Sequence, residues 1–205
     1  AIKGKDNFQK FDPIKISAGK TGLKPKDLIG IPWRVALALQ ADGWWLRSDI
    51  IWAKPNPMPE SVRDRPTKAH EYIFLLTKNQ KYYYDADAIK EPVAASTIGQ
   101  CGRTYDYRVS NADGKRNKRT VWNITTKPYK EAHFATFPPE LPEICIKAGC
   151  PQGGTVLDPF AGAGTTLYVA EQLGRNSIGI ELNPEYCEII RRRMAGLAMN
   201  LFLAK

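Results

Sequence analysis

The stretch that decides the fold is GGTVLDPFAGAGTTLYVAEQLGRNSIGIEL, residues 153–182. A short apolar segment ends at Asp158 and is followed by a turn rich in glycine. Apolar residues then recur at helical spacing until Gly174, and a second apolar segment, 176–182, carries Glu181 near its end. This order of strand, turn, helix and strand predicts an α/β protein with parallel strands.

The same stretch has the features of a nucleoside cofactor site. Asp158 and Glu181, 23 residues apart, lie at the carboxyl ends of the two expected strands, which is where α/β sheets bind ligands. Glu181 is placed to accept hydrogen bonds from both hydroxyls of a ribose. The turn fits neither a G-x-G-x-x-G fingerprint nor a Walker A loop. A tight turn without a ligand is the alternative.

Four small residues complete this expected site. The two glycines let the backbone pass close to a ligand, because a Cβ there would collide with it. The two threonines begin the helix, whose N-terminus favours a carboxylate or another anion. These residues are Gly162, Gly164, Thr165 and Thr166.

The remaining chain predicts further helices and strands by the spacing of its apolar residues. Helices are expected at 28–41, 137–149 and 183–194. Strands are expected at 44–54, 69–78 and 200–205, and 69–78 is apolar enough to be buried on both faces. The prolines between 55 and 66 predict a loop.

The charge balance favours a polyanionic partner. Thirty Lys and Arg against 21 Asp and Glu give a formal net charge of +9; generic solubility is the alternative. Within the polar stretch 92–130, a basic cluster predicts a loop that orders on a phosphate backbone, and a solvated loop is the other interpretation. Its cationic residues are Arg103, Arg108, Lys115, Arg116, Lys118 and Arg119.

Several classes of protein and site are disfavoured. No apolar run approaches the roughly 20 residues that span a bilayer, and the N-terminus has no secretory apolar region. The four cysteines and two histidines do not have the spacing of a zinc site, so we expect no metal and reduced, packed thiols. The arginine run 191–193 is expected to be a solvated helix end, with DNA contact as the second interpretation.

Residues 153–193 closely resemble the cofactor-binding half of S-adenosylmethionine-dependent DNA amino-methyltransferases, which methylate adenine N6 or cytosine N4. DIIWAKPNPMPES and KAHEYIFLLTK, within 24–92, resemble the later part of that family's catalytic half. HFATFPPEL at 133–141 resembles the motif that closes over the methionine moiety. The order of 24–92, the target-recognition insertion 93–130 and the cofactor half 133–205 matches the family's β arrangement, within a single domain 1–205.

The resemblance implies a Rossmann-like α/β fold, with a mainly parallel sheet, helices on both faces and a loop-rich insertion. It also implies S-adenosylmethionine as cofactor, double-stranded DNA as partner and a cytoplasmic restriction–modification role. The implied cofactor-binding residues are Asp158, Pro159, Phe160, Gly162, Gly164, Thr165, Thr166, Glu181, His133, Phe134 and Thr136.

The sequence departs from the family in one respect. It contains no [D/S/N]-P-P-[Y/F/W] tetrapeptide, which in the family holds the target amine, so no catalytic residue is assigned. We expect one or two further strand–helix units, N-terminal to Ala1 or on a partner chain, and a chain that is catalytically silent without them. A homodimer is also considered. The alternatives in function are an RNA or small-molecule methyltransferase and a non-catalytic cofactor- or DNA-binding fragment.

Overall fold

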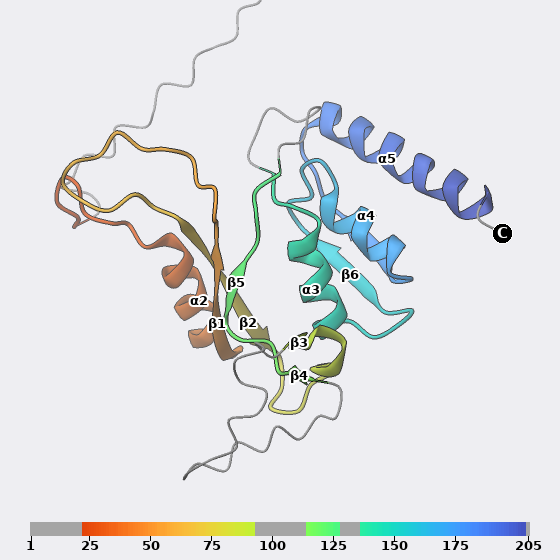
Figure 1. Ribbon diagram of the computed structural model, residues 1–205, viewed down its shortest axis with the longest axis horizontal. Helices are drawn as coiled ribbons and strands as arrows, with labels where there is room; N and C mark the ends of the chain where they lie inside the picture. Colours follow the sequence, from red (N-terminus) through yellow and green to blue (C-terminus); the bar gives the residue numbers. More distant parts are fainter. Residues whose placement is uncertain (1–21, 93–113, 128–135, 204–205) are drawn as a thin grey trace, which may run out of the picture.

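A computed structural model describes residues 22–92, 114–127 and 136–203 of the chain (Figure 1). Its first sheet has the strand order β2-β1-β5. β1 (Trp45–Ala53) pairs antiparallel with β2 (His70–Thr77) and parallel with β5 (Val121–Asn123). The carboxyl ends of β1 and β5 therefore lie at the same edge of the sheet.

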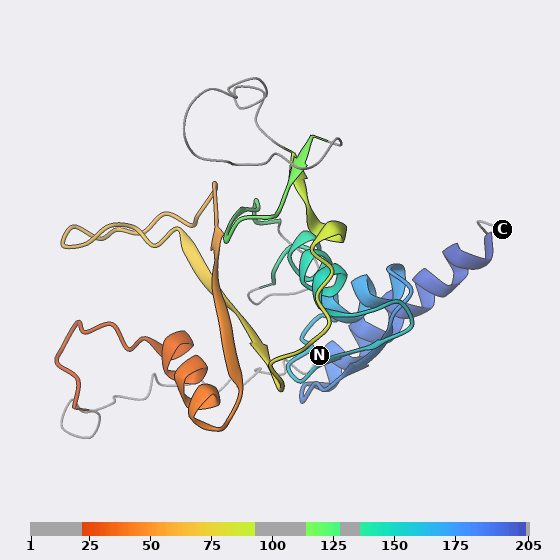
Figure 2. The same cartoon turned by 90° about the horizontal axis from the view of Figure 1, so that it is seen from below.

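Helices lie on both faces of this sheet (Figure 2). On one face, Trp33 of α2 (Ile31–Ala41) makes edge-to-face contacts with Tyr72 and Phe74 of β2 at 5.5 and 4.9 Å between ring centroids. On the other face, the core contains Trp52 and Ile124, joined by a 2.8 Å hydrogen bond from the indole to the Ile124 carbonyl. Apolar residues of α3 (Glu140–Gly149) pack against this core.

α3 connects the first sheet to a second one. β6 (Thr155–Asp158) and β7 (Asn176–Gly179) form a parallel pair, joined by α4 (Thr165–Gln172). Ile146 of α3 packs with Val169 and Ala170 of α4 in a second buried cluster. α5 (Pro184–Leu203) follows β7 and runs beside α4 (Figure 1). α3 is thus the shared layer between the two sheets.

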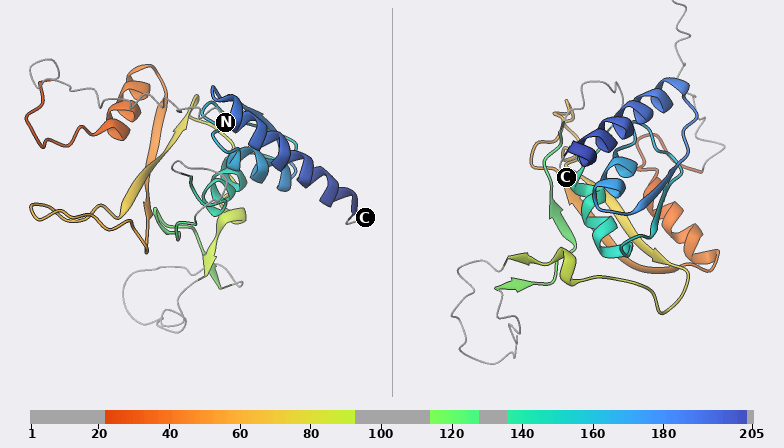
Figure 3. Two further views of the ribbon diagram at one scale, coloured as in Figure 1. Left: turned by 90° about the horizontal axis from the view of Figure 1, so that it is seen from above. Right: turned by 90° about the vertical axis from the view of Figure 1, so that its right-hand side faces the viewer.

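A third sheet is a short antiparallel ladder. β3 (Glu91–Pro92) follows the 3₁₀ turn η1 (Asp87–Ile89) and pairs with β4 (Lys115–Arg116). The ladder projects from the rest of the molecule (Figure 3). It closes the base of the expected insertion, of which 93–113 and 128–130 lie outside the described residues.

The α/β class with helices on both faces is confirmed, and the expected helices and strands of residues 153–182 are present. The expected strand at 200–205 is wrong, because α5 continues to Leu203. The expectation that 69–78 is buried on both faces holds only in part: Trp33 covers one face and the core contacts Ile73 on the other, but every residue of β2 except Thr77 stays partly exposed. β5 was not expected, since it lies in the polar stretch assigned to the insertion.

Candidate cofactor site

The candidate site lies where β6 and β7 end. Asp158 pairs with Gly179 in the parallel register, and Glu181 follows two residues later. Two backbone bonds continue the ladder past the strands: Ile180 N–H donates to the Asp158 carbonyl at 2.9 Å, and Ala161 N–H donates to the Ile180 carbonyl at 2.9 Å. The register therefore places both acidic residues at one edge, as the sequence predicted.

Glu181 is held by the backbone on both sides. Its Oε2 accepts a hydrogen bond from Gly162 N–H at 2.8 Å, and its Oε1 accepts one from Asn183 N–H at 2.8 Å. Each carboxylate oxygen accepts up to two hydrogen bonds, so acceptor capacity remains on both. Glu181 thus joins the glycine-rich turn to the start of α5 and still offers acceptors to a ligand.

Two apolar side chains close in sequence to the turn and to Glu181 are almost fully exposed. Phe160 is 89% exposed and Leu182 is 97% exposed. The backbone before Phe160 is fixed, because Asp158 Oδ1 accepts a hydrogen bond from Phe160 N–H at 3.0 Å. Exposed large apolar side chains beside polar groups often mark a surface that binds a ligand or partner.

The two glycines of the turn have different structural roles. Gly164 caps α4 in a left-handed conformation with φ of 74°, and a Cβ there would lie 2.8 Å from Ile190 Cγ1 of α5. Gly162 has φ of 53°, and a Cβ there would meet no atom within 4 Å. The structure therefore gives Gly164 a packing role against α5, whereas Gly162 faces open space.

These residues fit a nucleoside cofactor. A carboxylate with spare acceptor capacity suits ribose hydroxyls, and the exposed Phe160 and Leu182 suit a base. The N-terminus of α4 lies directly after the turn, with Thr165 buried and Thr166 beside Asp158 in the lining of one cavity. Thr165 and Thr166 open α4 as predicted.

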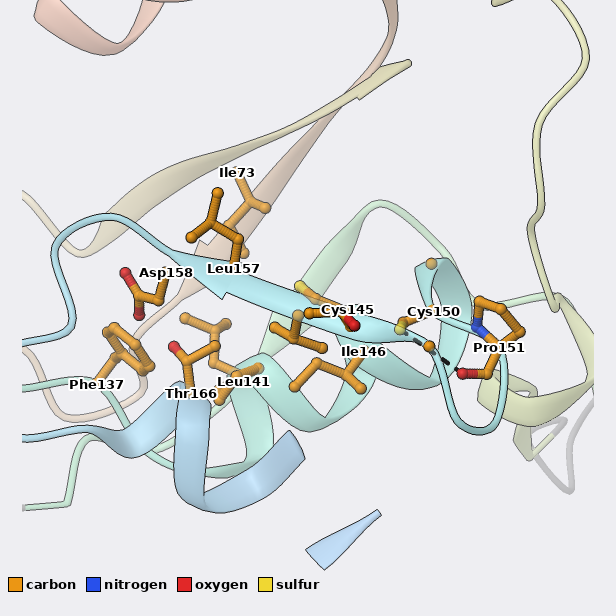
Figure 4. A pocket seen from close by; sticks show the side chains of 15 residues that line it. Ile73, Phe137, Leu141, Cys145, Ile146, Cys150, Pro151, Leu157, Asp158 and Thr166 are labelled. Atoms are coloured by element: carbon orange, nitrogen blue, oxygen red, sulfur yellow. Dashed lines mark hydrogen bonds between the residues drawn. The ribbon is translucent and has the colours of Figure 1, made fainter. Parts of the chain in front are cut away.

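That cavity of about 750 Å³ lies along β6, between the two sheets. Figure 4 shows Ile73 of β2 beside Leu157 of β6, with Leu141, Cys145 and Ile146 of α3 nearby. Among the described strands β6 pairs only with β7, so its other edge borders the cavity. Leu157 is 59% exposed there. Sequence analysis did not locate this cavity.

A second cavity of about 730 Å³ has a more polar lining. It lies where β1 and β5 end and β2 begins, and Thr136, one of the expected cofactor residues, contributes to it. Asn56 and Thr126 hold its wall together: Thr126 N–H donates to Asn56 Oδ1 at 3.0 Å. The other two expected lid residues, His133 and Phe134, lie outside the described residues.

The expected DNA-binding residues are only partly described. Arg103 and Arg108 lie outside the described part, whereas Lys115 and Arg116 lie on β4. Arg116 and Arg119 both donate to Glu91 Oε1, at 2.9 and 2.6 Å. Burial favours a higher pKa for Glu91, but the hydrogen bonds from Arg119 and Arg116 outweigh it and hold the pKa below its usual value.

One carboxylate therefore offsets part of the charge of this basic cluster. Lys118 lies with Nζ 5.6 Å from the centroid of the Trp122 ring, over the indole of β5. The base of the insertion is thus cross-linked by ion pairs and by a cation–π contact. The structure brings four of the six expected cations to one end of the molecule.

The described residues include several potential metal ligands and three of the four cysteines. Over residues 22–92, 114–127 and 136–203, no group of three or more His, Cys, Asp or Glu is arranged to hold a metal ion. Cys145, Cys150 and Cys187 are free thiols, and burial raises the pKa of Cys145 to about 11.

Among the helices of the described residues, none combines the length and apolarity needed to cross a membrane.

Comparison with known proteins places this geometry in a family. A family model described as DNA methylase, for N6 and N4 methyltransferases, matches residues 3–192. The Type II methyltransferase M.SmaI of Serratia marcescens is 55% identical over 173 residues, covering 84% of this chain and 54% of that protein. The chain spans about half the length of the first curated relatives it matches.

Solved structures agree on the fold. PvuII DNA methyltransferase, which is cytosine-N4-specific, superposes with a TM-score of 0.61 at 22% identity, covering 79% of this chain and 56% of that chain. The putative DNA modification methylase TTHA0409 of Thermus thermophilus, solved in complex with S-adenosyl-L-methionine, superposes with a TM-score of 0.52 at 26% identity, covering 81% of this chain and 59% of that chain.

Proposed function

The chain belongs to the DNA methylase family of N6 and N4 methyltransferases, and we propose that it binds S-adenosylmethionine and DNA within an enzyme that methylates an exocyclic base amine. The observation that carries the proposal is Glu181, held between Gly162 and Asn183 at the carboxyl edge of β6 and β7. When bound, the cofactor supplies an activated methyl group. This chain's residues bind and orient it, which accounts for much of the rate of such reactions.

The cofactor assignment rests on matched chemistry. Glu181 accepts from the ribose hydroxyls, Phe160 and Leu182 cover the base, and the N-terminus of α4 faces the carboxylate end. TTHA0409, a structural neighbour at 26% identity, was solved with S-adenosyl-L-methionine. The proposed cofactor residues remain those expected from the sequence, with Leu182 added because its side chain is 97% exposed.

The ribose contact is testable by changing protein and ligand together. We compare S-adenosylmethionine with its 2′-deoxy analogue by calorimetry, in the wild-type chain and in Glu181→Gln. A hydrogen bond to a carboxylate is worth about 1.5–3 kcal/mol, so the wild type should prefer the ribose form by roughly tenfold or more. Glu181→Gln should lose most of that preference, whereas Glu185→Gln, an exposed neighbour on α5, should keep it.

Comparing both ligands in both proteins separates an effect on ribose recognition from an effect on the shape of the site. Glu181→Gln also weakens the tether to Gly162, and that loss lowers affinity for both ligands alike. An unchanged ratio between the ligands in Glu181→Gln would remove the ribose assignment. Failure of the wild-type chain to bind S-adenosylmethionine at all would remove the cofactor proposal.

DNA is the proposed substrate because the chain is basic and the cations gather at the base of the insertion. Each phosphate contact contributes a slope of about −0.9 to log affinity against log salt. Neutralising Arg116, Lys118 and Arg119 together should flatten the slope for duplex DNA. A slope that stays the same would leave the cluster as a solvated loop. Methylation that does not depend on DNA would favour an RNA or small-molecule substrate, and insensitivity to salt would then point to the small molecule.

The catalytic tetrapeptide is proposed to enter at the open edge of β6. That edge has an apolar lining and backbone groups that no described strand pairs with, and unpaired strand edges in an apolar setting are costly. Ile178 and Ile180 lie on the same face of the β6–β7 sheet as Leu157, and their side chains are 55% and 58% exposed. We propose a strand parallel to β6, followed by a helix over this face, supplied N-terminally or by a partner chain.

Complementation tests this arrangement. The purified 205-residue chain should not methylate DNA on its own. Methylation should appear when the part of M.SmaI outside the matched region is supplied in trans, and it should be lost when Leu157→Asp places a charge at the open edge. Robust methylation by the 205-residue chain alone would refute the proposal.

A further inference from the structure

Arg193 differs from the two arginines that precede it. Along α5 it lies four residues after Ile189 and four before Leu197, which are 8% and 7% exposed. Residues four apart share a helix face, so Arg193 lies on the packed side of α5. Arg191 is exposed and pairs with Glu188 at 3.1 Å. The expectation of a solvated arginine run is therefore wrong for Arg193.

The Arg193 guanidinium contacts the glycine-rich turn on both sides of Gly164. Nη1 donates to the Ala163 carbonyl at 2.6 Å and to Thr165 Oγ1 at 3.3 Å. The guanidinium carbon also lies 5.1 Å from the centroid of the Tyr168 ring on α4. One side chain from α5 thus holds the last residues of the turn and the first turn of α4.

This placement is not a generic electrostatic one. A cation beside the N-terminus of a helix is opposed by the helix dipole, which favours cations at the other end. A charge-assisted hydrogen bond to the Ala163 carbonyl offsets that repulsion. Arg193 therefore occupies a position that helix-end electrostatics alone would disfavour, and its contacts are with the turn.

The turn is restrained from two directions. Glu181 holds Gly162 N–H at 2.8 Å, and Arg193 holds Ala163 and Thr165. Between these restraints, Gly162 borders open space, with no atom within 4 Å of a Cβ built there. A backbone that faces open space on one side keeps its shape only through the contacts on its other sides.

We infer that Arg193 is a positioning residue that holds the 162–165 turn in the conformation that binds the cofactor, without touching the cofactor itself. This inference rests on the proposed cofactor site. It assigns to the C-terminal helix a role in cofactor affinity that neither its sequence position nor its charge indicates.

The chain offers a matched control for this arginine. Arg175 is buried, at 6% exposure, whereas Arg193 is half-buried, and like Arg193 it donates to backbone carbonyls: to Cys150 at 3.2 and 3.0 Å and to Leu173 at 2.5 Å. It precedes β7, at the opposite end of that strand from Glu181. Arg175→Met therefore removes comparable contacts away from the turn, and Arg192→Met removes an exposed charge from the same helix.

Two measurements on the full 205-residue chain test the inference. Calorimetry gives the Kd for S-adenosylmethionine, corrected for the folded fraction from denaturation, and hydrogen exchange gives the protection of the 162–165 amides without cofactor. Arg193→Met should raise the Kd about tenfold, as expected for one lost charge-assisted contact, and speed exchange at the turn. Arg193→Lys should recover part of both, because it keeps the charge but loses the fork of donors.

The outcomes are distinguishable. Arg175→Met should lower the unfolding midpoint and leave the Kd and the exchange of the turn unchanged, and Arg192→Met should alter neither. Equal Kd values for the wild type and Arg193→Met would overturn the inference, and so would equal increases in Kd in Arg193→Met and Arg175→Met. If the wild type binds no cofactor, the cofactor proposal fails, and unaltered exchange of the turn in Arg193→Met would then overturn the inference separately.

Discussion

Gly164→Ala should destabilise the chain through two effects that the structure separates. Gly164 has φ of 74°, and a left-handed conformation costs an alanine about 1–2 kcal/mol. Its Cβ would also lie 2.8 Å from Ile190 Cγ1, and overpacking of this kind costs about 1–3 kcal/mol. The entropy lost by the unfolded chain returns up to about 1 kcal/mol. The net loss in free energy of unfolding is therefore about 1–5 kcal/mol.

Gly162→Ala is the matched control two residues earlier in the same turn. Its φ of 53° is also left-handed, but no atom lies within 4 Å of the added Cβ. It should therefore lose only the conformational part, less the same entropy return, for a net loss of about 0–2 kcal/mol. The difference between the two variants isolates the steric part.

Ile190→Ala provides an internal check on that steric part. It removes Cγ1 and Cγ2 and leaves Ile190 Cβ 3.5 Å from the new methyl group, an ordinary contact. Urea denaturation of the single and double variants, followed by tryptophan fluorescence, should show a favourable coupling of about 1–3 kcal/mol between Gly164→Ala and Ile190→Ala. Equal losses for Gly162→Ala and Gly164→Ala, within about 0.5 kcal/mol, would refute the packing role assigned to Gly164.

Two further predictions concern titratable groups. Because the folded-state pKa of Glu91 is lowered, its ion pairs with Arg116 and Arg119 stabilise the fold above the usual pKa of 4.5, and this contribution is lost as the pH falls through the lower folded value. The difference in unfolding free energy between wild type and Glu91→Gln should therefore be largest near neutral pH and shrink below pH 4.5. A difference that does not depend on pH would contradict this. Burial raises the pKa of Cys145 from 9.0 to about 11, so at pH 8 its thiolate fraction is about a hundredfold smaller than that of an ordinary thiol. Peptide mapping after treatment with iodoacetamide should therefore find Cys145 slowly alkylated. Alkylation as fast as that of a cysteine in a free peptide would contradict the raised pKa.

The last third of the chain could be predicted from sequence because its signals are local. Proline and glycine boundaries bracket α3 and α4, and the apolar segments that end at Asp158 and near Glu181 became β6 and β7. A parallel pair joined by one helix is specified within about 30 residues. Periodicity and turn chemistry suffice for such a unit.

Other elements depended on partners distant in the sequence. β5 has only three residues, and it exists because Ile51, Trp52 and Ala53 of β1 pair with it. The buried Trp122 and Ile124, two residues apart, were the available signal for that strand, since a half-buried strand alternates in this way. Near Leu203, an apolar run resembled a strand, but the backbone of α5 continues through it as a helix.

The site also divides into a part that this chain completes and a part that it leaves open. The cofactor edge is built by one βαβ unit, and Glu181 and Arg193 hold its turn through hydrogen bonds with Gly162, Ala163 and Thr165. The open edge of β6 is different, because its four residues line a cavity and no strand within the described ranges pairs with them there. Parallel strands end at a common edge, so a strand paired there would end beside Asp158 and the turn. A tetrapeptide following such a strand would reach the cofactor edge, which is the geometric reason to seek the catalytic group at the neighbour of β6.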